Sequence, residues 1–237
     1  MSNLFRFKRF DVDQSNCAMK VNTDGAILGA LASADQPKTI LDIGTGTGVI
    51  ALMLAQRFPG ANIDAVEIDR AAAQTAEANF KNSTFKGRLR LDASSFEDFF
   101  NSHPDARYDL IVSNPPFYIN SLASPGAEKK LAKHADVGFF EDLIRHSAAH
   151  LTKPGSLWLI LPIDTAELVK GLAMDAELFL NEQINVLSYP DFAPHRQMLM
   201  FSLNSLKTVE KQFVIYNEPK RYSKQYEDAL RDFFTIF

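Results

Sequence analysis

The chain has 237 residues, 46% of them apolar, which is enough to bury one core of ordinary size. Its 25 Lys and Arg residues against 29 Asp and Glu residues give a formal net charge of −4, which excludes a uniformly basic nucleic-acid binder but permits a local basic surface. The single cysteine cannot form an internal disulfide, and no apolar run approaches the roughly 20 residues of a membrane helix, so we expect a soluble cytoplasmic protein without a membrane anchor.

Short β-rich apolar runs alternate with longer helical patterns from residue 38 to about residue 162, which is typical of a parallel sheet covered by helices on both faces. These runs predict strands at 39–43, 62–67, 87–91, 109–113 and 156–161. The patterns between and around them predict helices at 26–33, at 47–58 after a Gly-rich turn, and at 70–80, where Asp69 is placed to cap the first turn.

The pattern continues after residue 161 with a helix near 165–175 and two strands, 184–189 and 197–203, that are close enough to pair as an antiparallel edge. A last apolar run at 213–216 precedes a polar segment whose end, 226–234, has helical spacing. The whole pattern predicts an α/β fold of the Rossmann-like type, with seven strands in a mostly parallel sheet.

No repeat, low-complexity tract or linker interrupts this pattern, which favours a single domain over residues 1–237. We expect a helical N-terminal extension over 1–36, a core over 37–205 and a C-terminal strand and helix over 206–237. The polar stretch 118–137, which contains Pro125-Gly126, predicts a long loop of the kind that usually carries function.

The Gly-rich turn at 44–48 follows a strand and opens a helix, the position where doubly wound folds bind nucleotide-like ligands. Its spacing is G-x-G-x-G, whereas the dinucleotide fingerprint is G-x-G-x-x-G. Asp42 at the end of the preceding strand would repel a pyrophosphate but would attract a cationic ligand. These residues favour S-adenosylmethionine, which carries a sulfonium and an ammonium and has no phosphate.

Two more carboxylates follow the ends of the next two predicted strands. Glu67 can accept both ribose hydroxyls of a nucleoside, and Asp92 can accept a hydrogen bond from an adenine amine. An isolated Asp at such a position is as often a turn or cap residue. Because Asp42, Glu67 and Asp92 all follow successive strands, we expect them to meet at one edge of the sheet.

Asn114-Pro115-Pro116-Phe117 follows the fourth strand at the same expected edge. Two prolines cannot continue a sheet, so they hold the Asn114 side chain and the Pro115 carbonyl in a fixed turn. Two such acceptors can bind both hydrogens of an exocyclic amine and turn its lone pair toward a methyl donor, while Phe117 stacks on the base. The competing interpretation is a merely rigid loop, which would be preferred if the string stood alone.

The Gly-rich turn and the Asn-Pro-Pro-Phe string resemble the class I S-adenosylmethionine-dependent amino-methyltransferases. Residues 19–30, 114–117 and 222–234 are most similar to the bacterial family that methylates the exocyclic amine of the adenine beside the anticodon of a valine tRNA. The resemblance spans nearly the whole chain. It implies transfer of the sulfonium methyl group to the N6 amine of that adenine, with tRNA as the partner and no metal.

The resemblance also implies that Lys20, Thr23 and Asp24 close over the cofactor and the substrate from the N-terminal side, although Thr23 or Asp24 could equally cap the helix at 26–33. The expected catalytic residues are Asn114, Pro115, Pro116 and Phe117. The expected cofactor-binding residues are Lys20, Thr23, Asp42, Gly44, Gly46, Gly48, Glu67, Ile68, Asp92, Ala93 and Asn114. The expected RNA contacts are Arg6, Lys8, Arg9, Lys129, Lys130, Lys133, Lys220 and Arg221, although each cluster alone is commonly a solvated face.

Rival functions remain open at this point. A glutamine-amide methyltransferase of peptide-release factors uses the same Asn-Pro-Pro-aromatic string but carries a helical domain in front, for which the start of the first strand near residue 39 leaves no room. A ribosomal-RNA or DNA amino-methyltransferase would share the catalytic residues, and an RNA-binding module could keep the fold without catalysis.

Five residues outside these motifs also bear on the function. His146 and His150 share a helical spacing with Asp142, but we interpret the two histidines as solvated rather than as metal ligands. We expect Trp158 in the core and Arg196 paired with a neighbouring acid, and we expect the chain to act as a monomer.

Overall fold

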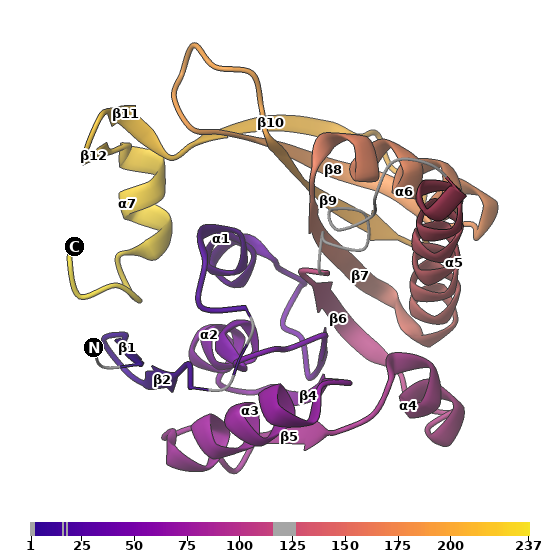
Figure 1. Ribbon diagram of the computed structural model, residues 1–237, viewed down its shortest axis with the longest axis horizontal. Coiled ribbons are helices and arrows are strands. Elements are labelled where there is room, and N and C mark those ends of the chain that lie inside the picture. Colours follow the sequence, from indigo (N-terminus) through magenta and orange to yellow (C-terminus); the bar gives the residue numbers. More distant parts are fainter. Residues whose placement is uncertain (1–2, 16, 18, 116–126) are drawn as a thin grey trace.

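The computed structural model describes residues 3–15, 17, 19–115 and 127–237; for residues 127–136 it describes the helix but not the side chains. Its centre is an eight-stranded sheet in the order β10-β8-β9-β7-β6-β3-β4-β5 (Figure 1). Helices lie on both faces of this sheet, as the alternation of strand and helix patterns predicted.

The parallel part of the sheet matches the predicted strands closely. It consists of β3 (Thr39–Ile43), β4 (Asn62–Val66), β5 (Leu89–Asp92), β6 (Tyr108–Ser113) and β7 (Leu151–Leu161). Side chains alternate between the two faces: Ile40 and Leu110 join one buried cluster, whereas Leu41 and Ile111 join the other. The five strands end at one edge, because neighbouring strands run in the same direction.

One strand of the described sheet runs the other way. β9 (Arg196–Ser202) is antiparallel to both of its neighbours, β7 and β8 (Phe179–Leu187). The pairing of the two late strands is therefore confirmed. The sheet has eight strands rather than the expected seven because β10 (Val209–Val214) adds itself in parallel to β8.

The helices divide between the two faces. α1 (Thr23–Leu31), α2 (Val49–Arg57) and α3 (Arg70–Asn82) bury their apolar side chains in one cluster with residues such as Ile27, Met53 and Phe80. α4 (Phe96–Ser102), α5 (Ala127–His150) and α6 (Ile163–Asp175) supply the other cluster. Asp69 caps α3 as predicted, since its carboxylate accepts the Ala72 N–H at 2.8 Å.

The prediction of a loop over 118–137 is wrong for residues 127–137, which are helical. α5 begins at Ala127 and continues for 24 residues. The segment from 127 is rich in Ala, Glu, Lys and Leu, whose helix propensity outweighs the polarity that suggested a loop. The first part of that stretch lies outside the described residues.

The N-terminal extension is only partly helical. β1 (Leu4–Arg6) and β2 (Asp11–Asp13) pair as an antiparallel hairpin ahead of α1. The alternation of aromatic and basic residues in this stretch fits the two-residue period of a strand, in which Phe5 and Phe7 lie on a common side as near ring neighbours, 4.9 Å between centroids. The expectation of a wholly helical extension over 1–36 is corrected accordingly.

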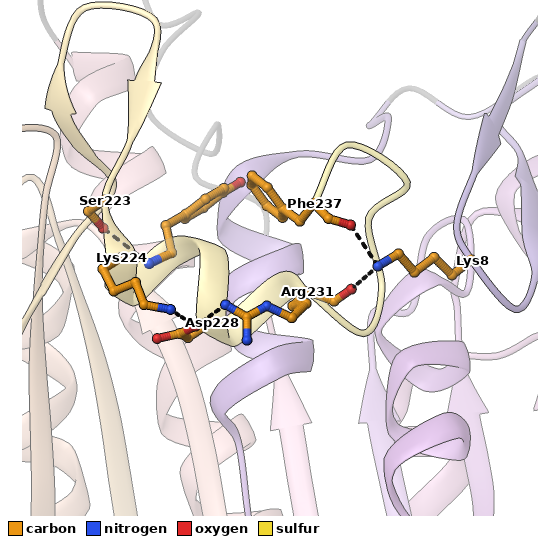
Figure 2. A network of polar contacts seen from close by, with 7 residues as sticks. Lys8, Ser223, Lys224, Asp228, Arg231 and Phe237 are labelled. Atoms are coloured by element: carbon orange, nitrogen blue, oxygen red, sulfur yellow. Dashed lines mark hydrogen bonds and ion pairs between the residues drawn. The ribbon is translucent and has the colours of Figure 1, made fainter.

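The C-terminal segment adds a second hairpin, β11 (Tyr216–Glu218) with β12 (Arg221–Tyr222), and then the predicted helix, α7 (Lys224–Leu230). The two ends of the chain lie together (Figure 1). Lys8 Nζ donates to the carbonyl oxygens of Arg231, at 2.6 Å, and of Phe237, at 2.8 Å (Figure 2). The terminal segments therefore close over one face of the core, where Phe7 pairs with Phe234.

Candidate active site

A cavity of about 990 Å³ lies over the edge at which the parallel strands end. Its wall combines the residues that follow β3, β4, β5 and β6 with the segment before α1 and the start of β9. The carboxyl ends of parallel strands are the usual ligand site of doubly wound folds. The sequence predicted this edge as the site.

The Gly-rich turn forms the floor beside β3. Gly44, Gly46 and Gly48 have φ values of 70°, 57° and 81°, the left-handed region that glycine adopts without strain. A Cβ at Gly48 would lie 2.5 Å from Phe80 Cε1, so α2 can approach α3 only without a side chain there. Gly44 and Gly46 line the cavity.

Glu67 lies at the end of β4 with its carboxylate fixed by main-chain donors. Its Oε2 accepts the Gly46 N–H and its Oε1 accepts the Asp69 N–H, both at 2.9 Å. Only 9% of the residue is exposed, and it lines the cavity. Ile68 follows with 73% of its surface exposed, which offers an apolar contact at the rim.

Asp42 takes a position that the sequence reasoning missed. It is fully buried and is not among the described residues that line the cavity. Its Oδ2 accepts the Thr45 hydroxyl at 2.6 Å and the Ala51 N–H at 3.1 Å, while its Oδ1 has no partner among the described residues. Burial raises the pKa of Asp42 to about 7. The Asp42 carboxylate therefore stabilises the Gly-rich turn through these two hydrogen bonds.

The third predicted carboxylate, Asp92, is half-buried and is not among the described residues that line the cavity. Asp92 is the last residue of β5 and Ala93 is exposed next to it, yet it is Ser94 and Ser95 after them that line the cavity. Direct contact of Asp42, Asp92, Ala93 or Gly48 with a ligand stays a prediction. Glu67 is the carboxylate of this set that the structure places at the cavity.

Asn114 comes directly after β6 and lines the cavity together with Pro115. Its side chain is 8% exposed, and its Oδ1 has no hydrogen-bond partner among the described residues. A buried amide oxygen without a donor costs on the order of 1–3 kcal/mol, which a ligand N–H can recover. Pro116 and Phe117 lie outside the described residues.

The first turn of α1 packs close to Asn114. A Cβ at Gly25 would lie 3.7 Å from Asn114 Nδ2 and 3.4 Å from Asn22 Oδ1. Asn22 itself caps α1 by accepting the Gly25 N–H at 2.8 Å, so the expected cap at Thr23 or Asp24 is wrong. Lys20, Thr23 and Asp24 line the cavity.

The start of β9 contributes residues that the sequence did not assign to the site. Arg196 Nε donates to Asp24 Oδ2 at 2.8 Å, which confirms the expected pairing of Arg196 with an acid and joins β9 to α1. His195 lines the same cavity, and desolvation together with the neighbouring Arg196 lowers its pKa. The sequence predicted that the two late strands pair antiparallel, but it did not indicate that the start of β9 lies against this cavity.

The expected RNA-contacting cations take several environments. Arg6, Arg9, Lys220 and Arg221 are exposed, whereas the Lys8 ammonium binds the C-terminal carbonyl oxygens (Figure 2). Lys129, Lys130 and Lys133 belong to α5, in the part whose side chains are not described. Contact of these residues with RNA stays a prediction.

The two histidines of α5 are buried rather than solvated, which corrects the expectation. His146 is 9% and His150 7% exposed, and His146 stacks on Phe100 with ring centroids 5.3 Å apart. No group of three His, Cys, Asp or Glu side chains in the described part of the chain could hold a metal ion. Trp158 lies in the core as predicted, 2% exposed.

Comparisons with known proteins identify the family of the chain. A family model described as the methyltransferase small domain matches residues 17–167. A Pedobacter heparinus protein named tRNA1(Val) (adenine(37)-N6)-methyltransferase is 44% identical over all 237 residues and 100% of both chains. A Bacteroides thetaiotaomicron protein of the same name is 40% identical over 97% of this chain and 96% of its own.

Solved structures share the fold at low sequence identity. A protein described as a predicted O-methyltransferase from Agrobacterium tumefaciens superposes with a TM-score of 0.69 at 18% identity, covering 89% of this chain and 96% of that one. TrmN from Thermus thermophilus superposes with a TM-score of 0.57 at 20% identity, covering 76% of this chain and 47% of that one. Both likenesses concern the Rossmann-like architecture.

Proposed function

The chain belongs to the methyltransferase small domain family, and from this premise we propose that it transfers a methyl group to the N6 amine of adenine 37 in tRNA1(Val). The relatives that carry this activity in their names match the chain over nearly its full length. The observation that carries the proposal is the unpartnered Asn114 Oδ1 at the wall of a cavity that also holds Glu67.

The residues around the Gly-rich turn fit S-adenosylmethionine better than a dinucleotide. A pyrophosphate would need the free N–H groups of the turn, but the Gly46 N–H is already donated to Glu67. Glu67 retains acceptor capacity for ribose hydroxyls, and the exposed Ile68 provides an apolar surface for an adenine ring. When bound, S-adenosylmethionine supplies a methyl group on a sulfonium centre.

Methylation of the adenine amine needs groups that accept hydrogen bonds from the amine more than it needs a general base. The lone pair of an exocyclic amine is delocalised into the adenine ring, so the amine is a weak nucleophile. Asn114 Oδ1 and the Pro115 carbonyl can each accept one amine hydrogen, which holds the nitrogen with its lone pair turned out of the ring plane. The methylated nitrogen is strongly acidic and can lose its proton to water, so catalysis here is mainly positioning.

None of the helices that the structure describes is long and apolar enough to cross a membrane. We infer a cytoplasmic enzyme that works as a monomer and as one domain over 1–237, with Phe117 stacking on the acceptor adenine beside Asn114.

The experiment that tests the proposal uses cofactor labelled on the methyl group. The protein is incubated with total tRNA from a strain that lacks it, and the tRNA is digested and analysed for nucleosides. We expect label in N6-methyladenosine, and only in tRNA1(Val). Parallel reactions contain ribosomal RNA and a peptide-release factor. Label in either of those pools with none in tRNA would overturn the proposal.

A further inference from the structure

The segment 188–195, between β8 and β9, lies at the same edge of the sheet as Asn114. β9 is antiparallel, so its first residue lies where the parallel strands end, and Arg196 pairs with Val186 near the end of β8. The last residue of the segment, His195, lines the cavity. The strand order puts β9 on the opposite side of β6 from β3, β4 and β5. The segment therefore borders the acceptor side of the cavity.

The segment is backed by the β11–β12 hairpin. Tyr216 N donates to the Ser188 carbonyl oxygen at 3.0 Å, and the ring centroids of Tyr189 and Tyr216 lie 5.7 Å apart. Tyr216 in turn stacks on Tyr222 at 5.0 Å. Figure 1 shows the segment, at the top of the view, next to the hairpin. Main-chain hydrogen bonds and a row of rings thus hold the segment against the body of the protein.

One ring of this row is open to solvent. Phe192 is 59% exposed, and its ring lies 5.0 Å from that of Tyr189, which supports it from behind. The Phe192 N–H donates to the Tyr189 carbonyl oxygen at 3.1 Å, which fixes the turn that carries the ring. Phe192 belongs to the segment whose last residue, His195, lines the cavity, and an exposed aromatic ring held in place there offers a stacking surface for another base.

The hairpin behind this ring is cationic at its tip. Lys220 and Arg221 are exposed, and the 3.7 Å contact of Arg221 with Glu218 lies on an open surface where it is weak. A strand of RNA whose adenine enters the cavity must carry its neighbouring nucleotides across the rim. Aromatic rings next to exposed cations suit the bases and phosphates of such a strand.

We propose that Phe192, supported by Tyr189, is the stacking surface for a nucleotide adjacent to the acceptor adenine, with Lys220 and Arg221 contacting the phosphates that follow it. This inference rests on the proposed function. It assigns the segment 188–195 to substrate recognition and leaves the chemistry to Asn114.

The test compares three variants in methyl transfer to an anticodon stem-loop that contains the acceptor adenine. Phe192→Ala should raise KM for the RNA about tenfold or more, with kcat and the cofactor Kd changed less than about twofold. Phe192→Tyr should keep the wild-type KM because it keeps a ring. Phe179→Ala, at the opposite edge of the sheet and 37% exposed, is the matched control and should also keep it.

Two readouts separate stacking from general damage. Phe192→Ala should leave the salt dependence of KM unchanged, whereas Arg221→Ala should reduce its slope. Two further stem-loops each lack one base, on the 5′ or on the 3′ side of the acceptor adenine. One of them should bind wild-type protein more weakly than the intact stem-loop does, but should bind Phe192→Ala no more weakly, because the stacking partner is already lost.

Different outcomes would contradict the stacking role of Phe192 and the proposed tRNA methyltransferase function. A wild-type protein that methylates the stem-loop while Phe192→Ala keeps a normal KM would overturn the stacking role and leave the proposed function standing. A wild-type protein that methylates no tRNA would overturn the proposed function, and the assignment of Phe192 with it.

Discussion

The cavity has two sides that are built in different ways. The side formed by β3, β4 and β5 consists of short consecutive stretches in which main-chain donors fix the acidic groups, as Gly46 and Asp69 fix Glu67. The side formed by β6 and β9 brings together residues far apart in the chain, including Asp24, Asn114 and His195. Its central acceptor, Asn114 Oδ1, is left without a partner among the described residues.

We infer from this difference that the two sides carry different tasks, cofactor binding on the β3–β5 side and acceptor positioning on the β6–β9 side. On the cofactor side, main-chain donors already hold the Glu67 carboxylate, so changes there should alter cofactor affinity and stability. The acceptor side has an open hydrogen-bond position, so changes there should alter turnover and RNA recognition. The following predictions test that separation, beginning with the largest effect.

Replacing Asn114 by Ala should lower kcat by about three powers of ten, because one of the two amine acceptors is lost in the transition state. The cofactor Kd, measured by calorimetry, should stay within about threefold. The mirror variant Glu67→Gln should raise the cofactor Kd about tenfold or more and keep kcat at saturating cofactor. If the two variants affected the same parameter, the separation of the two sides would be wrong.

Replacing Gly48 by Ala should lower the free energy of unfolding by about 2–4 kcal/mol. The residue has a φ of 81°, and the added Cβ would meet Phe80 at 2.5 Å. Gly87 is the control, since a Cβ there meets no heavy atom within 4 Å. Urea unfolding of both variants measures the difference, and equal stabilities would contradict this description of the turn.

The stability of the protein should depend on pH through Asp42. The folded-state pKa is raised to about 7 by burial, so the contribution of this carboxyl is fully present below its unfolded value of 3.8 and is lost as pH rises through 7. The Asp42→Asn variant has no charge to bury, so its stability relative to wild type should increase from pH 4 to pH 8, by roughly 1–3 kcal/mol. Denaturant unfolding of both proteins at several pH values measures this difference in the free energy of unfolding. A difference that stays constant with pH would contradict a raised pKa of a buried Asp42 carboxyl.

Replacing Asp24 by Asn should have the smallest effect. The Asp24–Arg196 pair is partly exposed, with 14% and 27% of the two side chains accessible, so its loss should cost about 1 kcal/mol. Because the pair joins α1 to β9 at the acceptor side, KM for the RNA should rise a few-fold while the cofactor Kd stays the same. If the substitution changed only the cofactor Kd, the role of Asp24 on the acceptor side would be wrong.

The sequence predicted the turn after β3 and the strand end at Glu67 because their signals are local. The G-x-G-x-G spacing, the cap at Asp69 and Glu67 at a strand end each depend on a few neighbouring residues. The role of Asp42 was harder to predict. Its position at a strand end does not determine whether the side chain faces the cavity or packs under the Gly-rich turn. Its two hydrogen bonds, to Thr45 and Ala51, depend on the fold of the whole turn.

The acceptor side was only partly predictable because its contacts are long-range. Asn114 was found from its prolines, but His195 reaches the cavity only because β9 is antiparallel. Lys8 was expected at a nucleic-acid surface, yet its ammonium binds carbonyl oxygens more than two hundred residues away in the chain. The sequence shows such a cation but not the partner that folding brings to it.

The most direct test of the separation between the two sides is the distance from adenine N6 to Asn114 Oδ1 in a complex with S-adenosylhomocysteine and an anticodon stem-loop. We expect a hydrogen bond of about 3 Å, with the base on the β9 side of Asn114 and the thioether sulfur on the β3 side. An adenine bound over β4 and β5, or with N6 beyond the reach of Asn114, would contradict it.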